Sequence, residues 1–466
     1  MSPSRRQFLA TGASVLGAPF RIPAQELPPP ERFTSRAGLL ELDLEAGFVF
    51  TDLAGRRARC YAYNGQVPGP VLEARAGETV RVRFTNRLPE PTNVHYHGLH
   101  VDPDGFADNV FLEIDPGETL TYEFNLPPRH PASTNWYHPH LHGRTARQLA
   151  WGMAGLFLVR GELDQIPEVA AAHEHLLVLK DYGIRPDGSV SPGPLLTVSG
   201  RLNPQLRLEQ GGLLRLRILN ASIDSHFLIR LEEHPLHIIA TEGGGLPEPI
   251  ETDTLLVAPG ERFDLLIHGS RPPGAYRLMS LGYDNQSGMG NMPGMAGQRP
   301  EVLATVVYEG RVERPLEVPR RLMRVEPLPP PELPVRSFEF RTLDLPSGIS
   351  FLINGRTFDH ERIDTRVRLN TIEDWEIVNA DPMDHPIHVH TNSFQIIGRD
   401  GEPERAWKDI LNVPGRSSRR FRVRYEDFIG RSVYHCHRVA HGDLGMMGVL
   451  EIEPGPLVVP PRSRAP

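Results

Sequence analysis

A pattern that recurs three times along the chain constrains its fold more than any other feature of the sequence. Each copy opens with a glycine-containing pair, continues into a run of alternating apolar and polar residues, and ends on an asparagine. The copies begin at Asn64-Gly65, Ser199-Gly200 and Asn354-Gly355 and end at Asn86, Asn220 and Asn379. Because successive copies lie a domain length apart, the sequence predicts three homologous domains.

The runs between these copies are typical of β-strands. From Gly38 onwards, short apolar–polar alternations are separated by Gly, Pro, Asn and Asp, as expected of antiparallel sandwiches. The 46 prolines also disfavour long helices. The fold class predicted from the sequence is therefore all-β, with each of the three domains a β-sandwich.

Changes in composition give the expected boundaries. The first sandwich is expected at residues 35–162 and the second, which carries a methionine-rich loop, at 170–310. A proline-rich, stiff linker follows at 311–334, and the third sandwich occupies 335–455. The tail, residues 456–466, is expected to be disordered.

The first 24 residues are typical of an export signal. Arg5 and Arg6 form a twin-arginine pattern, which a mildly apolar segment follows. We therefore expect a periplasmic or extracellular protein, exported by the twin-arginine pathway. No apolar run approaches the roughly 18 residues of a membrane helix, so no membrane span is expected. The net charge of −8 gives no basic field for nucleic acid.

Half of the 20 histidines lie in four short clusters, one of which also contains Cys436. The clusters are His95-Tyr96-His97, His138-Pro139-His140, His385-Pro386-Ile387-His388-Val389-His390, and His435-Cys436-His437 followed by His441 and Met446. Imidazole, thiolate and thioether are together suited to copper. The other cysteine, Cys60, is expected to be a buried small hydrophobe.

Strand periodicity divides these ligands between two sites. Side chains alternate between the faces of a strand, so Cys436 should point away from His435 and His437. His385 is an odd number of residues from His388, and the simplest arrangement places it with Cys436. His441 and Met446 can fold back to complete a Cys-His-His-Met set, which is the blue-copper ligand set. The paired histidines would form a second site behind it.

These motifs resemble those of the multicopper oxidases, in particular the bacterial three-domain laccases and cuprous oxidases. The chain carries His-x-His-Gly, His-x-His, His-Pro-x-His-x-His and His-Cys-His-x-x-x-His-x-x-x-x-Met in the family's order, and the resemblance covers nearly all of the chain that follows the signal. It implies cupredoxin-like Greek-key sandwiches and four copper ions, with dioxygen and a phenolic or Cu(I) electron donor as substrates. We expect a monomer.

The resemblance also implies a role for each ligand. Type 1 copper would be bound by His385, Cys436, His441 and the axial Met446. Type 2 copper would be bound by His95 and His388. One type 3 copper would be bound by His97, His138 and His437, and the other by His140, His390 and His435. Electrons from the donor would pass through Cys436 to His435 and His437, and dioxygen would be reduced to water between the first and third domains.

Proton delivery is less clearly marked. In similar enzymes an acidic residue shortly after His-x-His-Gly assists, and Asp104 matches it best, with Asp108 as the alternative. A second family carboxylate directly follows the last type 1 histidine, but Gly442 occupies that position here. Asp443 is next in the chain and is the candidate to replace it.

Two features bear on the electron donor. Asp381 and Met383 match positions that bind the substrate ion in similar cuprous oxidases, although Asp381 could equally hydrogen-bond a phenol near His385. The loop with Met289, Met292 and Met295 offers soft thioether ligands for Cu(I), or is simply a flexible loop. An axial Met446 implies a low to medium type 1 potential, with the adjacent Met447 as the less favoured axial ligand.

Two other functions were compared with this one. Some exported proteins of this architecture have lost their copper ligands and serve as envelope or division scaffolds, but here every ligand position is filled. Copper nitrite reductases have two such domains and do not place histidines on both sides of the type 1 cysteine. The sequence therefore favours a laccase-like multicopper oxidase, with the copper-free scaffold as the alternative.

Overall fold

The computed structural model describes residues 26–285, 299–346 and 348–455. The expected export signal, the tail 456–466 and the loop with Met289, Met292 and Met295 lie outside the described residues. Among those described, no helix is long and apolar enough to cross a membrane.

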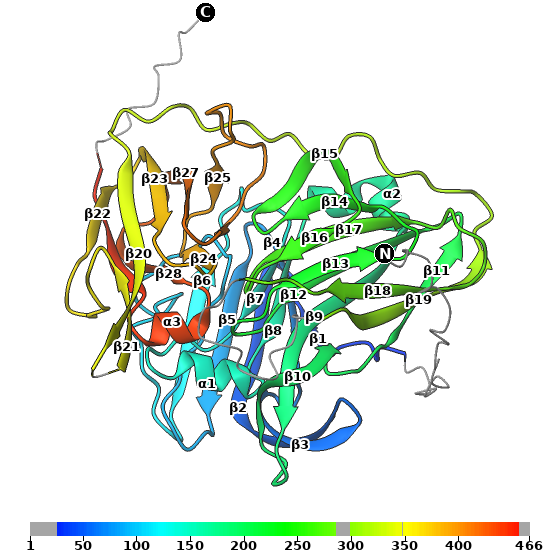
Figure 1. The fold of residues 1–466 in the computed structure, drawn as a ribbon, viewed down its shortest axis with the longest axis horizontal. Coiled ribbons are helices and arrows are strands. Elements are labelled where there is room, and N and C mark those ends of the chain that lie inside the picture. Colours follow the sequence, from blue (N-terminus) through cyan, green and yellow to red (C-terminus); the bar gives the residue numbers. More distant parts are fainter. Residues whose placement is uncertain (1–25, 286–298, 347, 456–466) are drawn as a thin grey trace, which may run out of the picture.

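Six sheets form three sandwiches, so the all-β fold predicted from the sequence is confirmed (Figure 1). In the first sandwich, sheet β1-β4-β8-β7 faces sheet β3-β2-β5-β6. Its elements are β1 (Arg32–Thr34), β2 (Leu39–Leu53), β3 (Arg56–Tyr63), β4 (Val71–Arg75), β5 (Thr79–Asn86), β6 (Thr119–Asn125), β7 (Ser133–Tyr137), α1 (Thr145–Ala150) and β8 (Gly155–Arg160).

The second sandwich pairs sheet β10-β9-β12-β17-β14-β15 with sheet β11-β19-β18-β13-β16. The chain enters it through two short helices, η1 (Glu162–Gln165) and α2 (Pro167–Ala171). Its strands are β9 (His173–Ile184), β10 (Val190–Val198), β11 (Gln205–Gln210), β12 (Leu213–Asn220), β13 (Phe227–Leu231), β14 (Leu236–Thr241), β15 (Gly244–Thr252), β16 (Leu255–Val257), β17 (Arg262–His268), β18 (Ala275–Leu281) and β19 (Glu301–Arg311).

The third sandwich pairs sheet β21-β20-β23-β27-β25 with sheet β22-β29-β28-β24-β26. A strand-free connection, residues 312–335, leads into it. Its elements are β20 (Arg336–Leu345), β21 (Gly348–Ile353), β22 (Thr365–Arg368), β23 (Thr371–Asn379), β24 (His385–Val389), β25 (Phe394–Ile396), β26 (Ile410–Val413), β27 (Ser417–Tyr425), β28 (Gly430–Cys436), α3 (Val439–Asp443) and β29 (Met447–Glu453).

The sequence repeat corresponds to a repeated backbone structure. Each opening pair has two successive positive φ angles, which are 48° and 68° at Asn64-Gly65, 49° and 79° at Ser199-Gly200, and 51° and 75° at Asn354-Gly355. Asn and Gly tolerate this left-handed conformation best, and two such residues in succession make the tight turn that suits a twisted hairpin.

The closing asparagines repeat one hydrogen-bond pattern. Asn86, Asn220 and Asn379 are buried, and the side-chain nitrogen of each donates to at least two backbone carbonyls. Each side-chain oxygen accepts from the backbone N–H two residues on. Each asparagine therefore fixes the loop after its strand, and the histidine clusters at His95 and His385 follow two of these loops.

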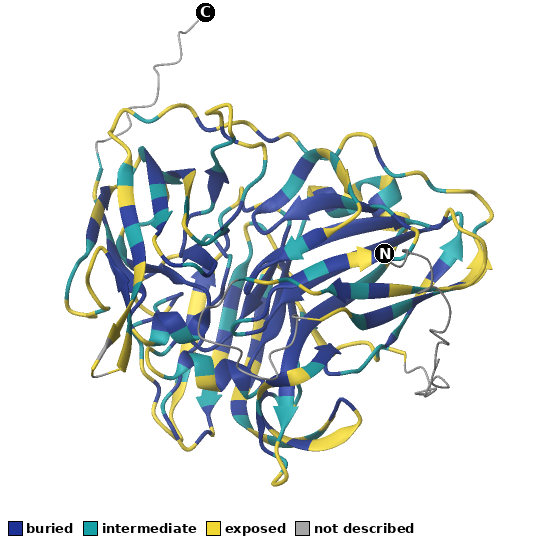
Figure 2. Ribbon diagram, viewed as in Figure 1, coloured by how far each residue is buried: buried dark blue, intermediate teal, exposed yellow. Residues whose placement is uncertain are grey.

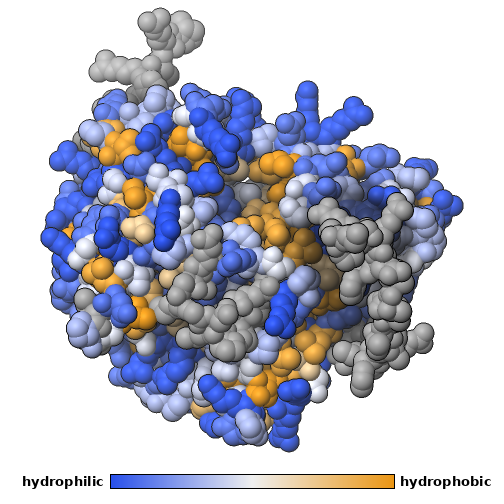
Figure 3. Space-filling view, in the orientation of Figure 1, coloured by the Kyte–Doolittle hydropathy of each residue, from blue (hydrophilic) through white to orange (hydrophobic). Residues whose placement is uncertain are grey.

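Each sandwich has its own apolar core, and a further buried cluster joins them. Trp136 and Leu158 of the first sandwich pack there with Val178 and Leu219 of the second and Val439 of α3. Buried residues accordingly continue through the strands where the sandwiches meet (Figure 2). The outer face shown in Figure 3 is largely hydrophilic, with scattered apolar patches.

Candidate metal centre

Cys436 lies at the end of β28 and forms a compact group with two histidines. Its Sγ is 3.4 Å from His385 Nδ1 and 3.7 Å from His441 Nδ1, and the two nitrogens are 3.3 Å apart. All three side chains are buried. Strand β24, which begins at His385, pairs with β28. Ile387 of β24 lies opposite Cys436, and His388 lies opposite His435. The structure thus brings together the cysteine and histidine that strand parity assigned to one site.

A short helix returns the chain to this group. After β28, α3 carries His441, and Met446 follows it. The Met446 carbonyl accepts from Cys436 N at 3.0 Å, and its N–H donates to the His441 carbonyl at 2.8 Å. Met446 is fully buried in the same core cluster as Cys436. The ring of Phe351 stacks on His441 at 4.0 Å and limits its movement.

The remaining paired histidines meet between the first and third sandwiches. His140 Nε2 and His390 Nε2 each lie 3.0 Å from His435 Nε2, and His97 Nδ1 lies 3.3 Å from His138 Nε2. The members of this second group are His95, His97, His138 and His140 from the first sandwich and His388, His390, His435 and His437 from the third.

Hydrogen bonds on one nitrogen determine what the other nitrogen can do. Nδ1 of His138, His388 and His435 lies within 2.8–3.0 Å of a backbone carbonyl, so that nitrogen carries the proton. The other nitrogen is then left with its lone pair. Buried Nε2 atoms of His95, His388 and His437 have no partner among the described residues. Unpartnered nitrogens in a buried histidine cluster fit a metal site.

The electrostatics of both groups also fit a metal. Burial lowers the pKa of His138 and His435 to about 3, so these rings are neutral at pH 7 and can act as ligands. Burial raises the pKa of the Cys436 thiol to about 12. A thiolate at this position therefore needs a cation beside it. Neutral imidazoles with one thiolate and one thioether are the donor set of copper.

The structure separates the two acidic candidates near the first histidine pair. Asp104 is exposed, and its carboxylate accepts from the Gly105 N–H. Asp108 is buried, with both carboxylate oxygens 2.9 Å from His95 Nδ1, and it also accepts from Tyr96 N. Burial raises the pKa of Asp108 well above its usual range. Of the two candidates, only Asp108 is in contact with His95, because the loop is exposed at Asp104 and is buried again at Asp108.

Asp443 hydrogen-bonds to the backbone of the first sandwich. Its carboxylate accepts from the N–H groups of Gly143 and Ala146 at the start of α1, at 2.9 and 2.8 Å, so it links the third sandwich to the first. Burial raises its pKa to about 6. A Cβ on Gly442 would lie 3.8 Å from His435 Nδ1 and 3.4 Å from the Cys436 carbonyl, so a Cβ fits at this position without a close clash.

Asp381 and Met383 are both buried, and Asp381 contacts a histidine of the Cys436 group. Asp381 Oδ2 is 2.9 Å from His385 Nε2, and its carboxylate also accepts from Thr342 N at 2.8 Å. This contact leaves His385 Nδ1 facing Cys436. Asp381 therefore orients the histidine, whichever donor approaches it.

Two residues beside the second group were not predicted from the sequence. Asp409 contacts His97 and His388, and Arg262 of the second sandwich pairs with Asp409. No local motif marks either residue. The available signal was a charged residue at the start of a largely buried strand, as Arg262 in β17 and Asp409 before β26 both are.

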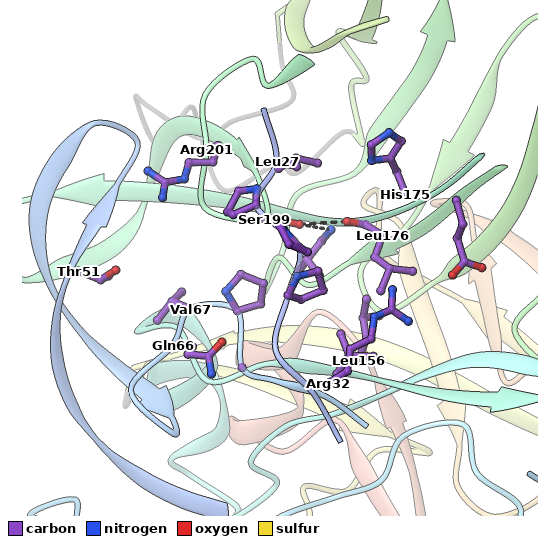
Figure 4. Close-up of a pocket in the computed structure, with 18 of the residues that line it drawn as sticks. Leu27, Arg32, Thr51, Gln66, Val67, Leu156, His175, Leu176, Ser199 and Arg201 are labelled. Carbon is purple, nitrogen blue, oxygen red and sulfur yellow. Dashed lines mark hydrogen bonds between the residues drawn. The ribbon is translucent and has the colours of Figure 1, made fainter. Parts of the chain in front are cut away.

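A separate pocket of about 490 Å³ lies between the first two sandwiches, under the segment that begins at Leu27 (Figure 4). Ser199 projects into it and is tied to the Leu176 carbonyl at 3.2 Å. Its charged residues Arg32 and Arg201 are paired with Glu73 and Asp52. It contains none of the ligands described above, so it is not the metal centre.

Three cupredoxin-like sandwiches with this donor set define a copper protein. Three multicopper oxidase family models match the chain at residues 49–164, 172–308 and 326–456, and together they span most of it. The chain belongs to the multicopper oxidase family.

Individual relatives differ in what their names state. A laccase of Bacillus stratosphericus is 27% identical over 92% of this chain and 98% of its own. The cell division protein FtsP of Yersinia pestis is 30% identical over 89% and 91%. Among solved structures, a Campylobacter jejuni multicopper oxidase described as a metallo-oxidase superposes with a TM-score of 0.81, at 27% identity over 92% of this chain and 96% of its own.

Proposed function

We propose that this protein is a laccase-like enzyme that couples one-electron oxidation of phenols, Cu(I) or both to the four-electron reduction of dioxygen to water. One observation carries the proposal. His435, Cys436 and His437 are consecutive, yet Cys436 belongs to one buried group and its neighbours to the other. A single peptide segment therefore joins the Cys436 group, which would accept electrons, to the second group of histidines, which would bind the other metal ions.

The proposal includes four copper ions. His385, Cys436, His441 and Met446 would hold the type 1 ion. The unpartnered nitrogens of His95 and His388 suit the type 2 ion. The close trios His97, His138, His437 and His140, His390, His435 suit the type 3 pair. Bound copper would supply reversible one-electron chemistry and a place for dioxygen.

The chain's own residues would orient ligands and move protons. Asp381 holds His385 in position, and Asp108 holds His95. With its raised pKa and its contact to His95, Asp108 is the carboxylate that we propose to carry protons in place of Asp104. Asp443 is proposed to tie α1 to α3, because the backbone of the α1 end engages both of its oxygens.

The electron donor would approach His385. Asp381 and Met383, with Met289, Met292 and Met295, are proposed to favour Cu(I) through carboxylate and thioether ligands. The test compares kcat/KM for Cu(I) and for a phenol on copper-loaded protein, with dioxygen uptake as the common readout. Replacing the three loop methionines with leucine should lower Cu(I) oxidation and leave phenol oxidation unchanged. Equal loss of both activities would remove the loop's assigned role.

A second candidate function is a copper-free scaffold in envelope or division assemblies. The FtsP relative favours it, whereas the complete ligand sets oppose it. Metal analysis of protein produced with copper decides between the two. Bound copper and a blue absorption band support the oxidase, and a colourless, metal-free protein supports the scaffold. We also propose that the protein is monomeric and that residues 1–24 direct export by the twin-arginine pathway.

A further inference from the structure

An ion pair lies where all three sandwiches meet. Arg262 begins β17 in the second sandwich and Asp409 precedes β26 in the third, and both are buried. Two parallel hydrogen bonds of 2.7 and 2.6 Å join them. The guanidinium also donates to the carbonyl of Thr134 in the first sandwich at 3.0 Å and to that of Gly260 at 3.1 Å. Every nitrogen of Arg262 is therefore held.

Asp409 in turn contacts two histidines of the second group. Its Oδ1 lies 3.1 Å from His97 Nε2, and its backbone carbonyl lies 2.8 Å from His388 Nδ1. An acceptor at one ring nitrogen keeps the proton there. His97 is thus left with a lone pair on Nδ1 and His388 with one on Nε2. The two rings stack at 3.8 Å with only 11° between their planes.

Asp409 is placed to orient these rings and not to bind a metal itself. Both of its carboxylate oxygens accept from Arg262, so a positive charge already occupies the face that a cation would need. The carboxylate accepts from Arg262 through both oxygens and faces His97 through Oδ1.

The glycine of His-x-His-Gly fits the same arrangement. A Cβ on Gly98 would lie 2.2 Å from Arg262 Nη2 and 3.0 Å from Asp409 Oδ2. The backbone beside His97 can approach the ion pair only because residue 98 has no side chain. Gly260 is packed as closely, since a Cβ added there would lie 2.7 Å from His437 Cε1.

We propose that Arg262 and Asp409 are positioning residues that fix the tautomers of His97 and His388, so that the second sandwich, which supplies none of the ligands, controls copper binding between the other two. The inference rests on the proposed function for its copper-dependent part only. The tautomers themselves are a property of the copper-free chain.

The test is Asp409→Asn, with Asp374→Asn as the matched control. Asp374 forms another buried bidentate pair, at 2.7 and 3.0 Å, and its partner Arg422 is not a proposed ligand. Copper per chain after dialysis against graded chelator, the type 2 electron paramagnetic resonance signal and the blue band are measured on each variant. Arg262→Lys is the conservative variant, because it keeps the positive charge but loses the two parallel hydrogen bonds of the guanidinium.

Asp409→Asn should retain the blue band. The chelator concentration that removes copper from the second group should fall about 10- to 100-fold, and the type 2 signal should change. Arg262→Lys should lie between it and wild type. Asp374→Asn should keep all copper even if its melting temperature falls. An unchanged type 2 signal and chelator resistance in Asp409→Asn, or equal copper loss in Asp374→Asn, would overturn the inference.

Nitrogen-15 spectra of histidines in the copper-free protein separate this inference from the proposed function. Wild type should show His97 protonated at Nε2 and His388 at Nδ1, and Asp409→Asn should change His97. If wild type shows these tautomers but binds no copper, the proposed function fails and the positioning role stands. If the tautomers differ from these, the positioning role fails even in an active oxidase.

Discussion

At the scale of single residues, the environment of each side chain decides its chemistry. Cys436 and Cys60 are both buried cysteines whose pKa burial raises to about 12. Only Cys436 has imidazole nitrogens around its sulfur, at 3.4 and 3.7 Å. Cys60 instead packs in a small apolar cluster with Leu53 and Tyr182. The same residue type is therefore a proposed metal ligand at one position and core packing at the other.

Replacing Cys436 with serine should abolish the blue band and donor oxidation, because a hydroxyl is a poor ligand for type 1 copper. Copper in the histidine cluster should remain, which copper analysis and the type 2 resonance signal measure. Cys60→Ser is the control and should keep the blue band. Substantial donor oxidation by Cys436→Ser would refute the account of the site.

His130 provides a prediction for pH. Burial lowers its pKa to about 4, and its Nε2 accepts from His100 N while Nδ1 donates to the Pro131 carbonyl. The unfolded chain binds this proton near pH 6.5 and the native protein does not, so the contribution to stability is lost as pH falls from 6.5 towards 4. Between pH 6.5 and 5 the loss is about 1.5 kcal/mol.

His130→Gln keeps a donor and an acceptor but cannot be charged. Urea unfolding of copper-loaded wild type and variant at pH 6.5 and 5 should therefore show a smaller loss of stability in the variant. Identical pH dependence of the two proteins would mean that His130 is not held neutral.

At the scale of elements, the repeated turns show how similar local sequence gives the same hairpin in each sandwich. The Asn64 and Asn354 side chains also bond to a neighbouring strand, through Glu45 N and Glu339 N at 2.7 Å. Ser199 does so more weakly, through Val178 N at 3.2 Å. Turn conformation and strand contact therefore support each other.

Gly355→Ala tests this conformation. Its φ is 75°, and an added Cβ would meet nothing within 4 Å, so any loss of stability comes from the backbone alone. We expect destabilisation of about 1–2 kcal/mol, measured as a lower melting temperature. Gly274→Ala, whose Cβ would make only ordinary contacts of 3.5 Å or more, should change little. A neutral Gly355→Ala would show that the turn is not held in the left-handed region.

At the scale of the whole molecule, buried charge joins the second and third sandwiches. Lys408 Nζ bridges Glu242 at 2.9 Å and Glu261 at 3.0 Å, and all three residues are buried. The backbone adds to this junction, since Gly243 N donates to the Trp407 carbonyl at 2.9 Å. Separating the sandwiches would expose or orphan these charges, which favours a closed interface.

The reactivity of lysine side chains tests whether that interface is closed. Lys180 and Lys408 are the only lysines of the sequence, and both are buried. An amine-reactive reagent should therefore label the native protein only at its α-amino group, while urea-unfolded protein should be labelled at both lysines. Peptide mass spectrometry locates the labels. Rapid labelling of Lys408 in native protein would contradict a closed interface between the second and third sandwiches.

The sequence alone determined the local features. Alternation and turn residues predicted the strands and the three-fold repeat, and strand parity separated Cys436 from His435 and His437, because these properties depend on neighbouring residues only. Tertiary structure decided what depends on distant residues. Asp409 meets His97 across more than 300 residues, and Arg262 reaches both from a third sandwich. The same holds for Asp104 and Asp108, since only the folded loop determines that Asp108 is the carboxylate buried against His95.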